Sequence, residues 1–534
     1  MPILNWIGKE AVVNHDKEVP FRLLKKVKSS SVGENSQNLI IHGDNLEALK
    51  ALMPYYQNKI KCIYIDPPYN TGNESWVYND KVNSPKIKKW LKQTVGAEGE
   101  DLCRHDKWLC MMYPRLKLLR DLLAEEGVIF ISIDDSEQEN LKQLLNEIFG
   151  IENYINTLVW RKKAGGGNDN RYFAVEHEYI FCFAKDKEQQ PRFLTKLNEK
   201  TIKDYKLKDD NFHKWGTYKL KNLYEPGIDQ NRPNLIYPIK APDGTMIDIS
   251  PGIWRWSKER FEFEKNRGKV EFKKDKKSGK WKVFYKLYIY EDGEDRKTVP
   301  RSILTEYGMN AQAAQELKEL FTDKIFDYPK PVNLIKHLVD ITSNKDSIVL
   351  DSFAGSGTTG HAVMQLNKED KGERKFILIE IGEKLLEPIM VKNLKINSTE
   401  EITRERIKRA IQNGKYNDGF EYCELDKPLF NEDGQIEEEC SFEQLATYIY
   451  FTETNTNINK KLISDNLIGE YNDIEYYLLF KEKGKNILNK SFLKKLHKND
   501  GKKVVYADKC MLDSKVLEVY NIQFKQIPYE VKVY

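Results

Sequence analysis

The sequence predicts an α/β fold, in which a doubly wound, mostly parallel sheet is divided by an inserted domain and followed by a small α+β C-terminal domain. Short continuous apolar runs alternate with helical patterns on both sides of a basic segment, as expected of parallel strands with helices on both faces. Polar turns follow these runs directly, and such sheets bind ligands at the carboxyl ends of their strands. A length of 534 residues suits about three domains.

The part of the chain before the basic segment contains the first predicted strands. Each is a short apolar run that stops at a turn, and apolar residues recur at helical spacing between the runs. We predict strands at 38–42, 60–65, 128–133 and 179–184, and helices at 46–52 and 108–126. A helix between successive strands is the connection that parallel pairing requires.

The part after the basic segment repeats this pattern and then changes. A helix is predicted at 332–341, a strand at 347–350, a glycine-rich turn that opens another helix, and a strand at 376–379. The pattern changes near residue 396, and the stretch 421–440, with eight acidic residues and one basic residue, is interpreted as a boundary. We therefore divide the chain into an N-terminal arm (1–38), a first half of the main domain (39–190), an inserted domain (191–325), a second half (326–395) and a C-terminal domain (396–534).

Composition argues against several classes of protein. No apolar run approaches the roughly 18 residues that a membrane helix needs. The first residues lack a basic segment followed by an apolar core, so no signal peptide is expected. The seven Cys residues are scattered and never spaced as CxxC, which argues against a disulfide scaffold or a zinc cluster. We expect a protein of the reducing cytoplasm, with no membrane partner.

Basic charge is concentrated in one part of the chain. The net charge is only +4, yet residues 191–300 hold 26 Lys and Arg against 17 Asp and Glu, an excess of 9. The same residues include 17 aromatic side chains, among them Trp215, Trp254, Trp256 and Trp281. Basic and aromatic side chains together can follow a phosphate backbone and stack on bases. The alternative is a lysine-rich surface domain without this function.

The run from Ser347 to Gly360, SIVLDSFAGSGTTG, predicts a strand, a tight turn and a helix start. It satisfies the spacing GxGxxG from Gly355, and Glu380 follows Gly360 by twenty residues at the end of the next strand. Small residues let a cofactor approach the helix N-terminus, and the acid can hold ribose hydroxyls. A dinucleotide and S-adenosyl-L-methionine (AdoMet) both fit. The turn therefore predicts a nucleotide-like cofactor without choosing between them.

The residues Asp66, Pro67, Pro68 and Tyr69 come directly after the predicted strand 60–65, where a catalytic loop is expected. An exocyclic base amine is a poor nucleophile because its lone pair is delocalised into the ring. Asp66 and the backbone carbonyl of Pro67 can accept its two N–H bonds, direct the lone pair toward a methyl donor and stabilise the developing positive charge. Tyr69 can stack on a base that has left the helix. A rigid turn beside a helix cap is the alternative.

Two other chemistries lack their motifs in this sequence. No Cys follows a Pro, so the Pro-Cys nucleophile that attacks a pyrimidine ring carbon is not expected. The GxxxxGK[ST] loop of nucleoside-triphosphate hydrolysis is missing too.

With DPPY at 66–69 and DSFAGSGTT at 351–359, the sequence resembles the amino-methyltransferases of DNA. The catalytic motif precedes the AdoMet motif, an order similar to that of the beta class, whose target-recognition domain lies between the two. Further stretches resemble the Mod subunits of type III restriction–modification systems: 40–52, 65–72, 128–137, 177–185, 330–338 and 524–531. The resemblance covers nearly the whole chain and is weakest at 191–325.

The resemblance implies roles for individual residues. Asp66, Pro67, Pro68 and Tyr69 form the catalytic loop. The implied AdoMet-binding residues are Asp44, Lys330, Asp351, Phe353, Gly355, Ser356, Gly357, Thr358 and Glu380. Asp44 would close the adenine end of the cofactor, although it can equally be a helix N-cap. Lys330 would lie beside the methionine part, or is otherwise only a surface charge.

The resemblance also implies the reaction and the partners. The substrate is double-stranded DNA, whose adenine is flipped out and methylated at N6 without a metal. A homodimer and a Res restriction subunit are the expected protein partners. Cytosine N4 or RNA as the target, and a solitary methyltransferase without Res, stay open. So do a nicotinamide-dependent oxidoreductase, which would not explain DPPY, and a non-catalytic specificity subunit, in which we would expect a decayed catalytic loop.

Overall fold

The computed structural model describes most of the chain in two compact units. The described residues are 4–33, 36–71, 100–165, 171–227, 232–247, 249, 252–291, 293–391, 394–416, 418–430, 436–437, 440–459, 463–464, 466–481, 485–497 and 499–527. The larger unit comprises residues 1–191 and 301–534, and the smaller unit comprises residues 192–300.

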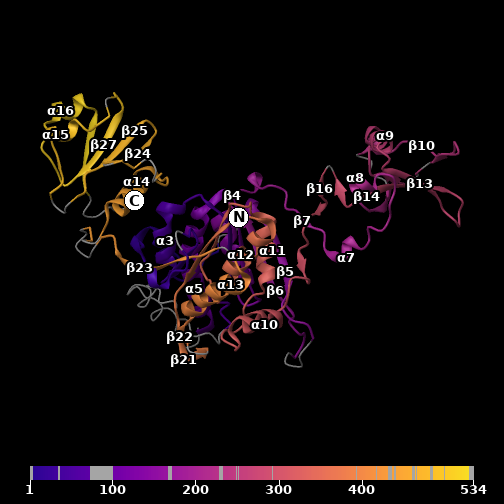
Figure 1. The fold of residues 1–534 in the computed structure, drawn as a ribbon, viewed down its shortest axis with the longest axis horizontal. Helices are drawn as coiled ribbons and strands as arrows, with labels where there is room; N and C mark the ends of the chain where they lie inside the picture. The colour runs from indigo at the N-terminus through magenta and orange to yellow at the C-terminus, as the bar shows by residue number, and fades with distance from the viewer. Residues whose placement is uncertain are drawn as a thin grey trace. The chain divides into compact units, whose positions relative to one another are not determined.

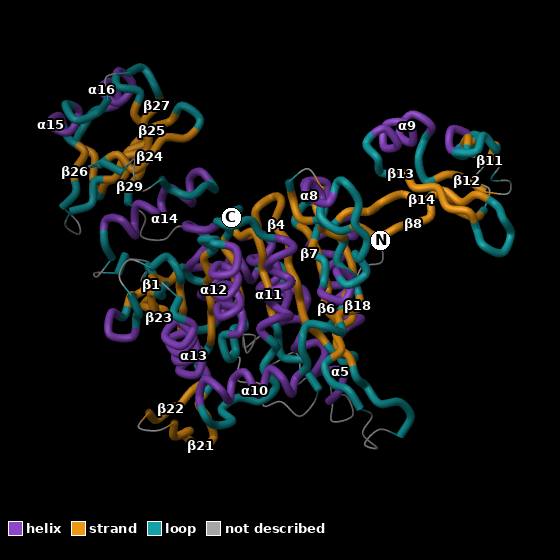
Figure 2. Tube along the Cα trace, turned by 45° about the vertical axis from the view of Figure 1, so that its right-hand side comes forward, coloured by secondary structure: helices purple, strands orange, loops and turns teal. Residues whose placement is uncertain are grey.

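Ten described strands of the larger unit form one sheet, in the order β1-β23-β2-β20-β19-β3-β4-β6-β5-β18. Figures 1 and 2 label some of them, among them β4, β6 and β23. Their bounds are β1 (Arg22–Lys26), β23 (Glu421–Pro428), β2 (Leu39–His42), β20 (Lys375–Glu380), β19 (Ile348–Asp351), β3 (Ile60–Ile65), β4 (Leu123–Ile133), β6 (His177–Ala184), β5 (Tyr154–Arg161) and β18 (Ile303–Leu304). From β23 to β4 all neighbours are parallel, while β1 and β6 pair antiparallel. The predicted doubly wound, mostly parallel sheet is confirmed.

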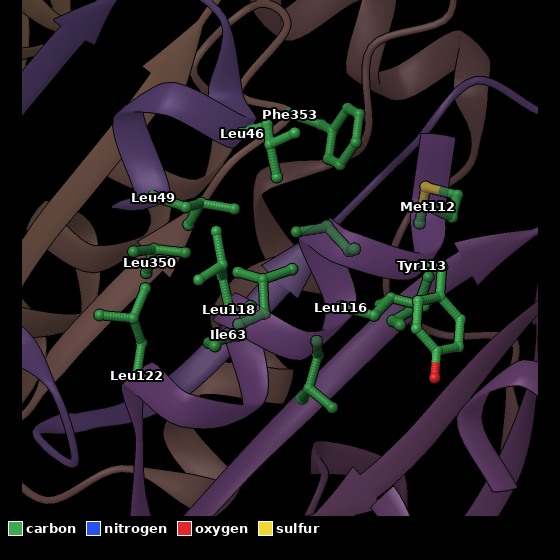
Figure 3. Close-up of a cluster of buried hydrophobic side chains, with 14 of the residues drawn as sticks. Leu46, Leu49, Ile63, Met112, Tyr113, Leu116, Leu118, Leu122, Leu350 and Phe353 are labelled. Carbon is green, nitrogen blue, oxygen red and sulfur yellow. The ribbon is translucent and has the colours of Figure 1, made fainter. Parts of the chain in front are cut away.

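Helices cover both faces of this sheet, as its continuous apolar strands require. One face packs on α3 (Asn45–Tyr56), α5 (Glu100–Leu122) and α6 (Gln138–Phe149), and Figure 3 shows Leu46, Leu49, Leu116 and Ile63 of β3 in one cluster of buried side chains. The other face carries α11 (Val332–Thr342), α12 (Thr358–Asp370) and α13 (Thr399–Gly414). Gly360 of α12 packs closely, because an added Cβ would lie 2.8 Å from Ile407 Cδ1 and 3.0 Å from Leu378 Cδ1, so these side chains would have to shift. Burial of each large apolar side chain here contributes roughly 1.5–3 kcal/mol.

Each strand predicted from an apolar run is present, with ends that differ by a few residues. The predictions missed β1, β5, β18 and β23 at the sides of the sheet. The predicted domain limits also differ from the observed ones. Residues 301–325, which include α10 (Asn310–Phe321), belong to the larger unit, and α13 and β23 pack with the main sheet although they follow residue 396. The first half of the acidic stretch 421–440 is therefore a sheet strand, since pairing with β2 and β1 outweighs its acidic composition.

The smaller unit has its own core. Its three-stranded sheet has the order β13-β14-β8, formed by Val270–Lys274, Trp281–Tyr288 and Tyr218–Asn222, and α9 (Lys258–Asn266) packs beside β13. Trp254 and Trp256 belong to this core, and Trp215 is buried against Tyr288. Because they are buried, these three tryptophans are not available to stack on bases, while a nucleic-acid role for the basic segment stays a prediction. They hold the unit together instead.

The last part of the larger unit has a sheet and buried clusters of its own, and its assignment as a separate domain stays a prediction. Its described part has a four-stranded sheet in the order β24-β25-β27-β29, formed by Leu467–Tyr471, Ile474–Leu478, Lys502–Ala507 and Ile522–Gln526. The helix α14 (Phe442–Thr454) contributes Leu445 and Ile449 to its core. The last part of the stretch 524–531 lies outside the described residues. In the part of the chain that the structure describes, no helix is both long and apolar enough to cross a membrane.

Candidate active site

The candidate site lies at the carboxyl ends of β3, β19 and β20. The chain leaves β3 through α5 toward β4 on one side, and leaves β19 through α12 toward β20 on the other. The order of the sheet therefore reverses between β3 and β19, which is where ligands bind in such folds. Asp66 follows β3, Asp351 ends β19 and Glu380 ends β20.

The predicted catalytic loop, residues 66–69, is held by hydrogen bonds from both sides. The Tyr69 hydroxyl donates to Asp66 Oδ1 at 2.7 Å, and the Trp108 indole donates to the carbonyl of Pro68 at 2.7 Å. Lys330, just before α11, donates from Nζ to both Asp66 oxygens at 2.9 and 2.7 Å and to the Tyr69 oxygen at 2.9 Å. Burial and the nearby carboxylates of Asp66 and Glu178 raise the pKa of Tyr69 well above its usual value, so its hydroxyl stays protonated.

A second carboxylate, that of Glu178 on β6, completes this cluster. Its Oε2 accepts from Tyr69 at 3.1 Å and lies 3.3 Å from Lys330 Nζ, and its Oε1 accepts from Lys162 at 3.2 Å. Burial alone would raise the pKa of Glu178, but the ammonium groups of Lys330 and Lys162 outweigh burial and lower it. Glu178 is therefore ionised. Glu178 lies in the stretch 177–185 that resembles Mod subunits, but no local motif predicts a role for this residue.

The glycine turn positions a different pair of carboxylates. Asp351 accepts from the Phe353 amide at 3.0 Å and from the Thr359 hydroxyl at 2.5 Å. Glu380 accepts from the Gly355 amide at 2.7 Å and from the Thr399 hydroxyl at 2.8 Å. Burial raises the pKa of each carboxyl to about 7, because these neutral donors only partly compensate for lost hydration.

Arg406 on α13 supports the same turn and was not predicted. Its Nη1 donates to Ser356 Oγ and Thr358 Oγ1, both at 2.7 Å. The guanidinium is completely buried, and burial lowers its pKa to about 10. Its Nε and Nη2 have no hydrogen-bond partner among the described residues. The sequence does hold a signal for it, since Ile402, Thr403, Arg406 and Ile407 lie on one buried helix face at helical spacing.

The remaining predicted residues have well-defined positions. Asp44 is the N-cap of α3, accepts from the Leu46 amide at 2.8 Å and pairs with buried Arg115 at 3.2 Å, so the helix-cap alternative is present in the structure. Phe353 is buried in the main core. The contacts of Lys330 described above are with the catalytic loop rather than with the glycine turn. The cofactor roles of Asp44, Phe353 and Lys330 stay predictions.

The residues around the turn fit AdoMet. Each Glu380 oxygen accepts one hydrogen bond, which leaves acceptor capacity for ribose hydroxyls. Arg406 adds a positive charge beside Ser356 and Thr358, and its Nε and Nη2 have no hydrogen-bond partner among the described residues. Gly357 has φ +80° and begins α12 without a side chain that would block approach to the helix N-terminus. Within the described ranges, no group of three or more His, Cys, Asp and Glu side chains can hold a metal ion.

Comparison with known proteins agrees with this site. Residues 60–393 match the family model described as "DNA methylase", N6_N4_Mtase. The chain belongs to this DNA methylase family. The matched residues run from the start of β3 through the smaller unit to the hairpin after β20, so they contain both the DPPY loop and the glycine turn.

Within this family, the chain is similar to Mod subunits of type III restriction–modification enzymes. It is 34% identical to the StyLTI Mod subunit of Salmonella typhimurium over 76% of this chain and 62% of that one. It is 36% identical to the EcoPI Mod subunit of Escherichia phage P1, over 77% and 68%. It is 30% identical to the EcoP15I Mod subunit of Escherichia coli, over 79% and 71%. The chain thus spans about two thirds of the length of these relatives.

A solved structure of PvuII DNA methyltransferase (cytosine-N4-specific) also matches, at 12% identity with a TM-score of 0.33, over 70% of this chain and 93% of that one.

Proposed function

We propose that this protein transfers a methyl group from AdoMet to the N6 amine of adenine in double-stranded DNA, as the modification subunit of a type III restriction–modification system. One observation carries the proposal. The catalytic carboxylate Asp66 follows β3 at the switch point, beside a glycine turn whose acid, Glu380, has acceptor capacity for a ribose. Membership in the DNA methylase family and similarity to Mod subunits support it.

The turn and its supports would hold the cofactor. Glu380 would accept the ribose hydroxyls, and the amides at the start of α12 would face an anionic group, with Ser356 and Thr358 fixed from behind by Arg406. When bound, AdoMet supplies an activated methyl group on a sulfonium. Asp351 fixes the turn itself, through the Phe353 amide and the Thr359 hydroxyl.

The catalytic loop would act on the target amine. Asp66 and the Pro67 carbonyl accept its two N–H bonds, which localises the lone pair on nitrogen. Trp108 fixes the next carbonyl, that of Pro68, so the loop backbone is held in place before the base enters. The Tyr69 hydroxyl is anchored below, and its ring would stack on an adenine flipped out of the duplex.

The activity is tested by incubating the purified chain with DNA and isotope-labelled AdoMet, followed by digestion and mass spectrometry of the nucleosides. We expect labelled N6-methyladenine. Labelled N4-methylcytosine would establish the alternative target. No label on any base, from a protein that binds AdoMet by calorimetry, would overturn the proposal. Sequencing of the methylated positions would also give the recognition site.

The smaller unit is proposed to read the DNA sequence. It contains most of the basic segment and folds as a unit with a core of its own, so it can vary without disturbing the main sheet. Exchange of residues 192–300 for those of a relative should change the methylated sequence while the methylated base stays the same. An unchanged target sequence would overturn this assignment.

The expected protein partners are a second copy and a Res subunit. Type III Mod subunits are named as parts of restriction–modification enzymes, and this chain is similar to them over most of its own length. Light scattering of the purified chain should report a dimer, and coexpression with a Res subunit from the same kind of system should give a complex. A monomer that methylates without any partner would favour a solitary enzyme.

A further inference from the structure

An ammonium group is buried between two carboxylates in the catalytic cluster. The side chains of Lys330 and Glu178 are 8% and 7% exposed, and the side chain of Asp66 is 26% exposed. Lys330 Nζ lies 2.7 Å from Asp66 Oδ2 and 3.3 Å from Glu178 Oε2. Burial works against the charge on Lys330, yet the two carboxylates outweigh it and raise the pKa of this lysine. Lys330 is therefore a fixed positive charge.

This charge lies where the proposed reaction least tolerates one. The amine nitrogen bonds to the methyl carbon, the electron pair of the broken carbon–sulfur bond stays on sulfur, and the nitrogen then loses a proton to Asp66 or water. Positive charge develops on the nitrogen meanwhile. That nitrogen must bind an Asp66 oxygen, so it comes within a few ångströms of Lys330, and like charges at such range repel strongly in a buried site.

Glu178 supplies the compensating charge. Asp66 and Lys330 alone sum to zero, and Glu178 makes the buried trio negative. Among the described residues, its one further ion pair is with Lys162, whose side chain is more exposed, at 20%, and better screened by water. Glu178 also competes with Asp66 for the single hydroxyl proton of Tyr69, whose oxygen lies 2.7 Å from Asp66 Oδ1 and 3.1 Å from Glu178 Oε2.

We propose that Glu178 is a positioning residue that neutralises Lys330, so that Asp66 can stabilise positive charge on the substrate amine. The inference rests on the proposed methyl transfer. It does not require Glu178 to touch the base or the cofactor. Its action is through Lys330 and Tyr69, and it should therefore affect the transfer step rather than the binding of either substrate.

The charge of Glu178 can be separated from its shape by two substitutions. Glu178→Gln keeps size and acceptor oxygen but removes the charge, whereas Glu178→Asp keeps the charge on a shorter side chain. We expect the single-turnover methylation rate of Glu178→Gln to fall about 10²-fold, and that of Glu178→Asp to fall clearly less. AdoMet affinity by calorimetry, DNA affinity and the melting temperature should stay near those of the wild type.

A matched control lies two residues away. Glu176 pairs with Arg161 at 3.2 Å and is 34% exposed, so Glu176→Gln removes one carboxylate charge from the same end of β6 without touching the cluster. This variant should methylate at the wild-type rate. A Glu178→Gln variant as active as the wild type would show that the charge of Glu178 is not needed. If Glu178→Asp is the slower of the two, Glu178 acts by packing. Either result would make the inference wrong.

A double-mutant cycle tests the partner directly. If Glu178 acts by neutralising Lys330, the loss caused by Glu178→Gln should shrink to less than about threefold when Lys330 is already Met. An equal loss in both backgrounds would overturn the inference. A wild-type protein that binds AdoMet but methylates no DNA would instead overturn the proposed function, so the two failures are distinguishable.

Discussion

The catalytic loop and the glycine turn place carboxylates at the ends of neighbouring strands but treat them in opposite ways. Glu178, in the cluster beside the loop, faces two ammonium groups, which lower its pKa although it is buried. Asp351 and Glu380, in the turn, have backbone amides and hydroxyls as their hydrogen-bond donors, and burial raises the pKa of each to about 7.

The opposite pKa shifts suit the two regions to different functions. A carboxylate beside a fixed cation stays ionised across the physiological range, which suits a site that must stabilise positive charge during a reaction. A buried carboxylate with neutral donors has acceptor capacity left and gains strongly from further hydrogen bonds, which suits the binding of hydroxyl groups. The first region should therefore control rate, and the second affinity.

The substitution Asp66→Asn tests most directly whether the loop controls the rate and the turn controls the affinity. The substitution removes the charge and lets an amide N–H face the substrate amine, so methyl transfer should fall about 10³-fold, the upper range for loss of such stabilisation. AdoMet binding by calorimetry should be unchanged. The matched control is Asp346→Asn, an exposed carboxylate just before β19 at the opposite end of the strands, which should leave both quantities unchanged. Normal methylation by Asp66→Asn would refute the role of the loop.

Glu380→Gln should show the opposite pattern. The variant loses charged hydrogen bonds to the ribose, each worth roughly 1.5–3 kcal/mol, so the Kd for AdoMet should rise about 10- to 100-fold. The transfer rate at saturating AdoMet should stay within a few fold of the wild type. Titration calorimetry and single-turnover rates measure the two quantities separately. A lost rate with an unchanged Kd would show that the two regions are not divided in this way.

The elements that the sequence predicted correctly are those with a strong local signal. The strand β3, IKCIYI, is buried along its whole length, and its apolar run matches its bounds without error. The strand β5, YINTLVWR, is mostly half-buried and mixes polar with apolar residues, so no run marks it. The strand β23 looks acidic and exposed, and only its pairing with β1 and β2 makes it part of the sheet. Local patterns cannot show such pairing.

The residues of the candidate site likewise fall into those with a local signal in the sequence and those without one. Asp66, Tyr69, Gly355 and Glu380 could be predicted because each belongs to a short motif that local chemistry explains. Glu178, Arg406 and the contact of Lys330 with Asp66 could not. The residues of that last pair are 264 positions apart in the sequence, and only the folded sheet brings them together.

The pH dependence of stability and of AdoMet affinity provides a further test of the turn. The pKa values of Asp351 and Glu380 rise from 3.8 and 4.5 to about 7 on folding. Between about pH 4 and 7 the folded protein therefore binds more protons than the unfolded chain, and these two groups contribute stability that is lost as pH rises through 7.

AdoMet binding should change in the other direction, because ionised Glu380 is the better acceptor. We expect the Kd to fall up to about tenfold between pH 6 and 8, and much less in Glu380→Gln. A Kd independent of pH in the wild type would contradict the buried, neutral-donor environment of the turn.

The smallest effect concerns the backbone of the two regions. Both need left-handed residues: the catalytic loop uses Asn70 at φ +59°, and the turn uses Gly357 at φ +80°. Asn adopts this conformation with little cost, whereas a Cβ at Gly357 would also lie 3.2 Å from Thr403 Cγ2 and 3.3 Å from its carbonyl oxygen. Gly357→Ala should therefore cost about 1–2 kcal/mol for the backbone, plus a contribution from crowding.

Gly165→Ala is the control, because Gly165 has φ +93° and no heavy atom within 4 Å of an added Cβ among the described residues. Thermal unfolding should show the larger loss of stability for Gly357→Ala. The difference from Gly165→Ala measures the steric cost of the contact between the added methyl group and α13. If the two variants unfold alike, Thr403 moves away at no cost, and α13 does not hold the turn as tightly as its hydrogen bonds through Arg406 indicate.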